Sequence, residues 1–503
     1  MAAPKLSRVR VLIPPTNAGK VLGALMVLCA LVAVAALGIL AVRSATRLSL
    51  RWDEWAYHIP IAAIRGGLPI PYDMNDVLSR YQAFPPLPEL VQGVLWRLNG
   101  SVNATGVVNF MAFVIFLGYC HVALRARIWL VALVSLTAPL VLIHSTVSYV
   151  DLFGNSFLAI GASSVLYLYL FPDRSSRLIL VGGLMGLVAA AWSKYQLAPV
   201  AVVLFILFTL VTLRLPRTAP FSRPQLATLV VTAAALATIP FVENLALHGN
   251  PFWPIRIPLP VLGDLFPYAV DTAQGAAANR PPTLAGVSQF EVFFRSLFEI
   301  DVPTEYPNRA RWIIDQGSTN AGLRMGGFWV GAVVVYLATT ITLLVLRDRK
   351  HGLIAAAAIG LMLCFVALIP QSHELRYFLF IPLTLAATIG MLFSALVDQR
   401  PRVCAAVLVI VLALFSHMAA VNSTYYELER IDYATAARLS GAPRWWAMLR
   451  SGETYCAVDI GAVAIMLTGP TMSEYTIVDR SSEALCPAGS LILTPAGLKG
   501  RAP

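Results

Sequence analysis

The chain has 503 residues, of which 58% are hydrophobic and only 13% are charged, and its formal net charge is +11. A soluble domain carries roughly 25% charged residues, so this composition excludes a soluble protein and indicates a polytopic membrane protein. Most basic residues gather in short loops between apolar segments, which favours a topology signal over nucleic-acid binding as the origin of the charge. We expect no nucleic-acid partner.

Apolar segments near 20 residues in length can cross the ~30 Å hydrocarbon core of a bilayer, and we predict about eleven of them. In chain order they are Val21–Val42, Thr105–Leu124, Ile128–Val147, Leu152–Phe171, Leu178–Trp192, Leu197–Leu213, Leu226–Leu247, Gly326–Leu346, Leu353–Ile369, Tyr377–Leu396 and Val403–Val421. The fifth and sixth are short and separated only by the residues SKYQ, which predicts a tight hairpin or two broken helices. The fold class is therefore an all-α polytopic membrane protein.

Every second connection between these segments is short and basic. These connections are Arg125–Arg127, Pro172–Arg177, Arg214–Arg223, Arg347–Lys350 and Gln399–Arg402, and Lys5, Arg8, Arg10 and Lys20 precede the first span. Basic residues mark cytoplasmic loops, so the amino end is predicted to be cytoplasmic. The long loops Ser44–Ala104 and His248–Met325 and the tail after Asn422 are then extracytoplasmic. We expect a multi-pass protein of the cell (inner) membrane with its active site on the outer face.

The first outer loop contains two predicted helices that are too short to span the membrane. The sequence EWAYHIPIAAIRGG, from Glu54 to Gly67, ends at a glycine pair, and the sequence PPLPELVQGVLWRLNG, from Pro85 to Gly100, begins with prolines. Their mixed apolar and polar residues predict helices that lie in the membrane interface. The second outer loop, with GNPFWPIRIPLP and TAQGAAANRPPTLAG, is typical of a lid over a site.

The tail is predicted to form a small extracytoplasmic α/β domain. YCAVDI, YTIVD and SLILTP have the pattern of short strands, and YATAARL that of a helix. We therefore divide the chain into a transmembrane domain at 1–422 and a C-terminal domain at 423–503. Cys456 and Cys486 are alone in the tail, which faces an oxidising compartment, and a disulfide between them is expected. No cysteine pattern resembles a metal cluster.

Three acids near the outer membrane surface are candidates for chemistry. Asp53 and Glu54 follow the first span, and Asp151 precedes the fourth, where a loop re-enters the membrane. An ionisable group at the edge of the hydrocarbon is costly and marks a functional candidate. The alternative is structural, because Asp53 and Asp151 could each cap the helix that follows, and Asp53 could also be a solvated loop acid.

Three cations are predicted on the same side: Arg80, Lys194 in the sequence SKYQ, and Arg376 directly before the tenth span. A single such residue is more often a snorkelling helix-end residue than a ligand. Three of them beside the acids favour an anionic headgroup as the ligand. His58 is a possible general base, although a lone histidine is more often a structural group.

Carboxylates and cations on one face suit a membrane enzyme that uses a lipid-phosphate donor. The phosphate is the leaving group, and arginine or lysine offsets its charge. A carboxylate removes the proton from the acceptor hydroxyl or amine as it attacks the sugar. The acids do not form a D-x-D pair, so no metal site and no cofactor are predicted. A divalent cation remains possible but is not expected to be obligatory.

Six motifs together point to a known family. They are WDEWAYHIP after the first span, FPPLPELVQG, YVDLFGNS before the fourth span, SKYQLAP, NLALHGNPFWP and HELRYFLFIP before the tenth. In their order and predicted side they resemble the GT-C membrane glycosyltransferases, of the type that includes the protein O-mannosyltransferases and the lipid A aminoarabinose transferase. The resemblance covers most of the chain through about Leu396.

The resemblance implies a role for each of the strongest candidates. Asp53 matches the family's catalytic base, and Glu54 supports it or binds the acceptor. Asp151 matches an acid that shapes the donor pocket. Lys194 and Arg376 match positions near the lipid phosphate.

One position departs from the family's pattern. The aminoarabinose transferase type has a Glu-Lys pair just before the proline motif, whereas this chain has the sequence QAF at residues 82–84. Arg80 is the nearest basic residue and is a candidate for the missing cation. Trp55, which could stack on a sugar, His58 and Tyr377 complete the predicted donor-binding set.

The favoured function is an inverting transferase that moves a sugar from a polyprenyl-phosphate donor to an extracytoplasmic glycan, lipid or protein acceptor. The alternative is a transporter or flippase for a lipid-linked or anionic solute, although transporters tend to show internal repeats and charges at mid-membrane. A non-catalytic scaffold is a third possibility, but it accounts poorly for acids and cations on one face.

Overall fold

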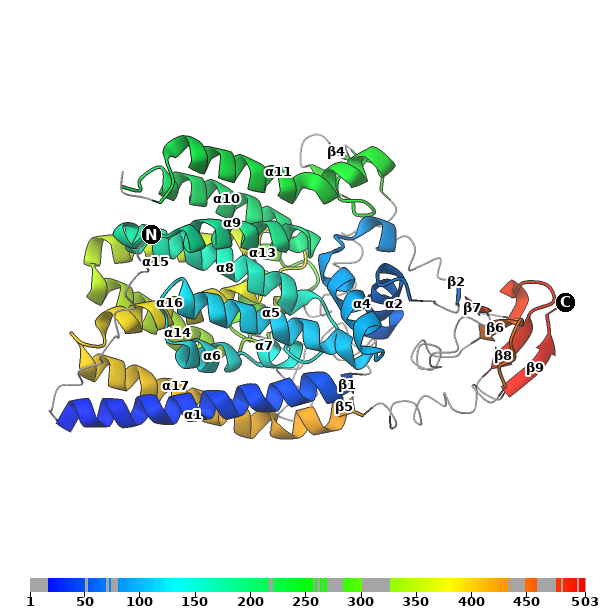
Figure 1. Ribbon diagram of the computed structural model, residues 1–503, viewed down its shortest axis with the longest axis horizontal. Helices are drawn as coiled ribbons and strands as arrows, with labels where there is room; N and C mark the ends of the chain where they lie inside the picture. The colour runs from blue at the N-terminus through cyan, green and yellow to red at the C-terminus, as the bar shows by residue number, and fades with distance from the viewer. Residues whose placement is uncertain are drawn as a thin grey trace, which may run out of the picture.

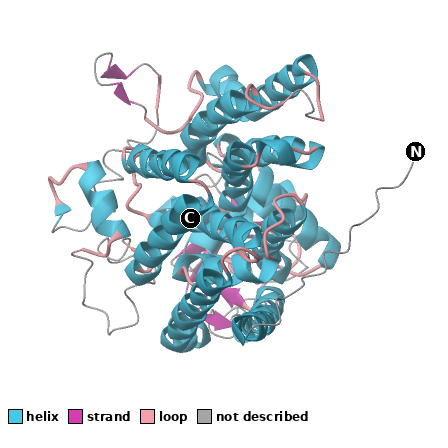
Figure 2. Ribbon diagram, turned by 90° about the vertical axis from the view of Figure 1, so that its left-hand side faces the viewer, coloured by secondary structure: helices cyan, strands magenta, loops and turns pink. Residues whose placement is uncertain are grey.

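The structure is a computed structural model. It describes residues 17–49, 53–68, 72–73, 80–216, 220–256, 258–259, 263–264, 266–268, 284–300, 326–432, 435, 448–458, 476–480, 483–494 and 497–502. Long helices run side by side through most of the molecule, two shorter helices close one end of the bundle, and a small sheet lies beyond them (Figure 1). Figure 2 shows the bundle from its other end, with strands confined to a few short pieces.

The predicted spans are helices over most of their length. The long apolar helices are α1 (Asn17–Thr46), α5 (Asn103–Val122), α8 (Asp151–Leu170), α9 (Arg177–Ala191), α10 (Ala198–Thr212), α11 (Arg223–His248), α14 (Val330–Arg347), α15 (Arg349–Ala367), α16 (Phe380–Leu396) and α17 (Pro401–Glu429). Within the described ranges, nine helices are long and apolar enough to cross a membrane, and α9 is a shorter apolar helix. The predicted tight turn between the fifth and sixth spans is present as the short helix η3 (Tyr195–Leu197).

The prediction of one continuous third span, Ile128–Val147, is wrong. The segment is broken into α6 (Ile128–Leu136) and α7 (Pro139–His144), and Ala138 between them has an extended backbone. The cause is Pro139, because a proline disfavours the helical conformation in the residue that precedes it. The remaining residues, 145–150, form the non-helical loop that leads into α8.

Two helical segments form the centre of the bundle. Of their most apolar windows, 83% is buried in α8 and 78% in the segment Leu375–Leu396, against 17% in α1. Small residues permit close packing here: a Cβ on Gly183 of α9 would lie 2.7 Å from the Cβ of Ser164 in α8, as is common between membrane helices. The two most enclosed helical segments therefore begin at Asp151 and near Arg376.

The first outer loop forms the two helices predicted for it. The first is a π-helical turn, η1 (Glu54–His58), followed by α2 (Ile59–Arg65), and the second is α4 (Leu87–Asn99). Gly66 and Gly93 let these helices meet backbone to backbone, because a Cβ on either glycine would collide with the main chain of the other helix. Of the predicted lid in the second outer loop, residues 272–283 lie outside the described residues.

Four strands of the tail and one short strand of the first outer loop form a five-stranded sheet with the order β2-β7-β6-β8-β9. Its strands are β6 (Thr454–Val458), β7 (Thr476–Arg480), β8 (Leu491–Thr494), β9 (Gly497–Arg501) and β2 (Tyr72–Asp73). Strand β2 belongs to the first outer loop and pairs in parallel with β7. The expected disulfide between Cys456 and Cys486 is present. Most of the predicted helix YATAARL lies outside the described residues, and the domain boundary after residue 422 stays a prediction.

A second pairing ties the tail to the membrane helices. Strand β1 (Leu48–Ser49), just after α1, pairs antiparallel with β5 (Arg430–Ile431), just after α17.

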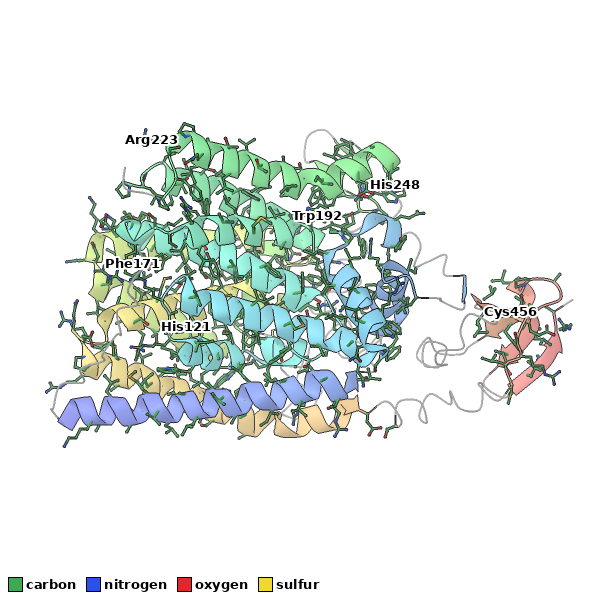
Figure 3. All side chains as sticks on the ribbon, viewed as in Figure 1. His121, Phe171, Trp192, Arg223, His248 and Cys456 are labelled. Atoms are coloured by element: carbon green, nitrogen blue, oxygen red, sulfur yellow. A yellow bond between two sulfur atoms is a disulfide. The ribbon has the colours of Figure 1, made fainter. Side chains whose placement is uncertain are left out.

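The connections predicted to be cytoplasmic lie at the end of the bundle opposite α2 and α4. Figure 3 shows Phe171 and Arg223 at that end, whereas Trp192 and His248 lie toward the end closed by α2 and α4.

Candidate active site

The predicted site residues converge at the end of the bundle that α2 and α4 close. Apart from Arg80, they come from four separate segments: η1 with the residue before it, the start of α8, the turn between α9 and α10, and the short helix η7 (Leu375–Phe378) before α16. Each lies at or next to the end of an apolar helix. Charged side chains from distant parts of the sequence thereby meet at one level of the molecule.

Asp53 and Arg376 form the first ion pair of the site. Nη1 of Arg376 donates to Oδ2 of Asp53 over 3.2 Å, although 323 residues separate them in the chain. Their side chains are 17% and 6% exposed. Asp53 precedes η1 but makes no side-chain capping bond to it. The structural alternatives of a helix cap and of a solvated loop acid are therefore both wrong for Asp53.

Arg376 is held by several further groups. Its Nη2 lies 3.2 Å from Oε2 of Glu374 and donates to the hydroxyl of Tyr377 over 3.1 Å. The guanidinium also lies 5.4 Å from the centre of the Tyr149 ring. Only 6% of the side chain is exposed. Arg376 is thus enclosed within the protein, and it is not a snorkelling residue.

Lys194 and Asp151 form the second ion pair. Nζ of Lys194 donates to Oδ1 of Asp151, which is 1% exposed. The ammonium group also lies 4.0 Å above the centre of the Tyr377 ring. Asp151 is the first residue of α8, and that helix has no side-chain cap. His144, the last residue of α7, places Nδ1 4.0 Å from the other carboxylate oxygen of Asp151.

Buried amide side chains fix the loop that leads to Asp151. Asn109 of α5 donates to the carbonyl of Val147 over 2.9 Å and accepts from the backbone of Phe153 over 2.9 Å. Gln92 of α4 donates to the carbonyl of Ser148 over 2.7 Å. Sequence reasoning missed both residues, and the signal available was a polar side chain within an apolar helix face.

Tyr57 and Arg80 extend the site toward the connector of the first outer loop. The Arg80 guanidinium lies 4.4 Å from the centre of the Tyr57 ring. Burial raises the pKa of the Tyr57 hydroxyl well above its usual range, and the negative charge of Asp53 adds to this effect. Tyr57 therefore stays protonated and can donate a hydrogen bond. Arg80 is at the edge of the cluster, one aromatic ring away from the Asp53–Arg376 pair.

The remaining predicted residues are buried behind this cluster. Nδ1 of His58 lies 3.0 Å from Oε1 of Glu89, which joins η1 to α4, and the His58 ring meets the edge of Tyr149. Trp55 and Glu54 are each 1% exposed. The contacts of His58 with Glu89 and Tyr149 thus hold the helices of the first outer loop together. Trp55 is enclosed in the protein and does not line an exposed surface.

Sequence reasoning also missed a polar junction centred on Tyr195. Its hydroxyl bonds the carbonyl of Ala83 and lies 3.0 Å from that of Trp253, and Asn244 of α11 donates to Ala83 over 2.9 Å and to the same hydroxyl. Three of the motifs that suggested the family, FPPLPELVQG, SKYQLAP and NLALHGNPFWP, meet at or next to this residue. The junction therefore ties Ala83, in the segment where this chain departs from the aminoarabinose transferase pattern, to Tyr195, the neighbour of Lys194.

Trp192 joins the same turn to α11. Pro240 lies inside α11 and has no N–H, which leaves the carbonyl of Leu236 without its usual helical donor. The indole Nε1 of Trp192 donates to that carbonyl over 2.7 Å. The bond satisfies the freed carbonyl and anchors the turn that carries Lys194.

Among the described residues, no group of three or more His, Cys, Asp or Glu side chains is arranged to hold a metal ion. The chemistry that the cluster offers is that of carboxylates beside enclosed cations. Two cations suit an anion, and a carboxylate on the same surface suits proton removal.

No known protein-family profile matches the chain, and no curated protein sequence matches it. Solved structures that are similar to it over most of their length include two of ArnT. ArnT from Cupriavidus metallidurans bound to undecaprenyl phosphate has a TM-score of 0.54 and 14% identity, over 91% of this chain and 86% of that one. The apo state of ArnT has a TM-score of 0.50 and 14% identity, over 92% and 86%. At this identity the likeness shows the fold alone: the chain has an ArnT-like, GT-C-type fold, as its motifs predicted.

Proposed function

We propose that this chain is an inverting glycosyltransferase that moves a sugar from a polyprenyl-phosphate donor to an extracytoplasmic acceptor. The observation that carries the proposal is the convergence of two ion pairs, Asp53–Arg376 and Asp151–Lys194, at Tyr377, which contacts both cations. They lie where two enclosed helical segments begin, at the level where a lipid headgroup would meet the protein.

Arg376 and Lys194 are the proposed phosphate ligands. Charged hydrogen bonds contribute about 1.5–3 kcal/mol each, and both cations are fixed before a ligand arrives. Positive charge that is already in place stabilises the leaving phosphate as its bond to the sugar breaks. ArnT, a protein of similar fold, has been solved bound to undecaprenyl phosphate, which supports a polyprenyl phosphate as the lipid here.

Asp53 is the proposed base. In the transfer step the acceptor O–H or N–H proton moves to the Asp53 carboxylate, and the acceptor atom forms a bond to the anomeric carbon. The bond between that carbon and the phosphate oxygen breaks, and its electron pair leaves on the phosphate. Attack from the face opposite the phosphate inverts the anomeric configuration. Glu54 supports Asp53, and Asp151 holds Lys194 in the donor pocket.

In the proposed orientation, the site lies on the extracytoplasmic side of the inner membrane. The short basic connections lie at the end of the bundle opposite the site, as Phe171 and Arg223 show in Figure 3, and basic loops are cytoplasmic. The disulfide between Cys456 and Cys486 supports an oxidising compartment for the tail. The acceptor is then a cell-envelope glycan, a glycolipid or a protein.

Comparative lipid analysis of a deletion strain tests the proposal and names the donor. Loss of the chain should make a polyprenyl-phosphate sugar accumulate, and the purified protein should consume that lipid and release polyprenyl phosphate. The matched control is the strain complemented with Asp53→Asn, which should accumulate the same lipid. If the purified protein moves the lipid across vesicle membranes without cleaving it, the chain is a flippase and the proposal is wrong.

A further inference from the structure

The proposed base and the proposed phosphate ligand are bound to each other. Arg376 contacts the carboxylates of both Asp53 and Glu374 at 3.2 Å. A donor phosphate that reaches this guanidinium therefore meets a cation that two carboxylates already neutralise. One of them has to give way for the phosphate to gain the full ion pair, because all three anions compete for one group.

The two carboxylates differ in how they are placed. Glu374 is two residues from Arg376 in the same loop, and its side chain is 1% exposed. Asp53 comes from a different element, 323 residues away, and its side chain is 17% exposed. The open side of the guanidinium is therefore the side of Asp53, and Glu374 is enclosed behind it.

The second contact of Arg376 also favours exchange at Asp53. The group that binds Asp53 is Nη1, whereas Nη2 contacts both Glu374 and the Tyr377 hydroxyl. Release of Asp53 leaves the contacts of Nη2 with Glu374 and Tyr377 in place. Release of Glu374 would instead separate a carboxylate that is only 1% exposed from a cation in the protein interior, which is costly.

We propose that the donor phosphate replaces Asp53 on Arg376, while Glu374 acts as a positioning residue that holds the guanidinium throughout. This exchange rests on the proposed function and adds a sequence of events to it: the donor binds first, and its phosphate then releases the base. The Asp53 carboxylate is paired with Arg376 until the donor phosphate takes its place, and it becomes available as the base only when a donor is bound. Repulsion between the released carboxylate and the phosphate then directs Asp53 toward the acceptor.

The exchange predicts that removing the proposed base strengthens binding of the lipid phosphate. Undecaprenyl phosphate is the probe, titrated against the purified full-length protein in detergent. Asp53→Asn keeps the size of the side chain and removes the competing charge, and it should bind the probe about tenfold more tightly. The gain should disappear in the double variant Asp53→Asn/Arg376→Ala, because it depends on the guanidinium.

Glu374→Gln is the matched comparison, since it removes a carboxylate at the same distance from Arg376. The exchange predicts no tightening, because Asp53 remains as the competitor. Glu483→Gln is the outside control: it removes the acid of an exposed pair with Lys499 in the C-terminal tail and should leave affinity unchanged. The thermal unfolding midpoint of each variant shows that the protein is folded.

Two results would overturn the exchange: Asp53→Asn binding the probe no more tightly than the wild type, or Asp53→Asn and Glu374→Gln tightening equally. The second would mean that binding follows total charge rather than replacement of one carboxylate. Turnover of the same Asp53→Asn protein separates this inference from the proposed function. Lost turnover with unchanged affinity removes only the exchange, whereas retained turnover removes Asp53 as the base.

Discussion

The ring of Tyr377 lies 4.0 Å below the ammonium group of Lys194. Its hydroxyl accepts a hydrogen bond from Arg376 over 3.1 Å, and the same guanidinium lies 4.9 Å from the ring centre, so one side chain contacts both proposed phosphate ligands. Tyr377 therefore fixes the separation of the two cations.

Two substitutions of Tyr377 separate the hydrogen bond made by its hydroxyl from the cation–π contacts made by its ring. Tyr377→Phe removes the hydrogen bond and keeps the ring, and it should raise the donor KM up to about tenfold, since such a bond contributes about 0.5–1.5 kcal/mol. Tyr377→Leu also removes the cation–π contacts of the ring with Lys194 and Arg376, each worth roughly 0.5–2 kcal/mol, and should raise KM further. Steady-state kinetics with a polyprenyl-phosphate sugar measures both. Equal effects of the two substitutions would show that the ring supports neither cation.

Lys194 has a structural and a functional consequence that a second substitution can separate. Lys194→Met leaves the carboxylate of Asp151 buried without its cation, which costs about 3–5 kcal/mol of unfolding free energy for a buried pair. Lys194→Met/Asp151→Asn removes the stranded charge and should restore the thermal unfolding midpoint. Donor affinity should remain roughly tenfold or more below that of the wild type in both proteins.

The recovery of stability without recovery of donor binding is the informative result. If Lys194→Met/Asp151→Asn regains donor affinity together with stability, Lys194 is a structural partner of Asp151 and not a phosphate ligand. Arg376 would then be the remaining phosphate ligand in the ion-pair cluster, with Arg80 beside it.

Tyr195 is predicted to act on the donor through the position of its neighbour Lys194. Tyr195→Phe removes a buried hydroxyl shared with Ala83, Trp253 and Asn244, and should cost about 1–3 kcal/mol of stability and raise the donor KM. Tyr119→Phe is the matched control, because the Tyr119 hydroxyl bonds Ser164 over 2.7 Å in the bundle interior. It should lower stability similarly and leave the donor KM unchanged. Equal kinetic effects in the two variants would contradict a positioning role.

The apolar helices were predictable from sequence because each depends on a local run of residues, yet the effect of a proline was not. Pro139 ends a helix, whereas Pro240 stays inside α11, where Trp192 satisfies the freed carbonyl of Leu236. The difference is a tertiary contact, so a pattern of apolar residues does not contain it. For this reason the third span was predicted as continuous and is broken.

The site was predictable as a set of residues but not as a set of pairs. Each of Asp53, Asp151, Lys194 and Arg376 stands out as an ionisable residue beside an apolar span. Which acid pairs with which cation depends on how the helices pack, because Asp53 and Arg376 are 323 residues apart in the chain and Asp151 and Lys194 are 43 apart. Glu374 and Tyr195 sit next to predicted residues and carry no separate pattern, and their roles follow only from the contacts that the folded chain makes.

Turnover of the purified Asp53→Asn protein is the most direct measurement of whether Asp53 removes the acceptor proton. The assay follows release of polyprenyl phosphate from a polyprenyl-phosphate sugar at saturating donor, with Glu483→Gln as the control for loss of an exposed acid. Asp53→Asn should remain folded and lose roughly 10²–10⁴-fold in turnover, while Glu483→Gln should be unaffected. Near-normal turnover in a folded Asp53→Asn protein would exclude Asp53 as the base.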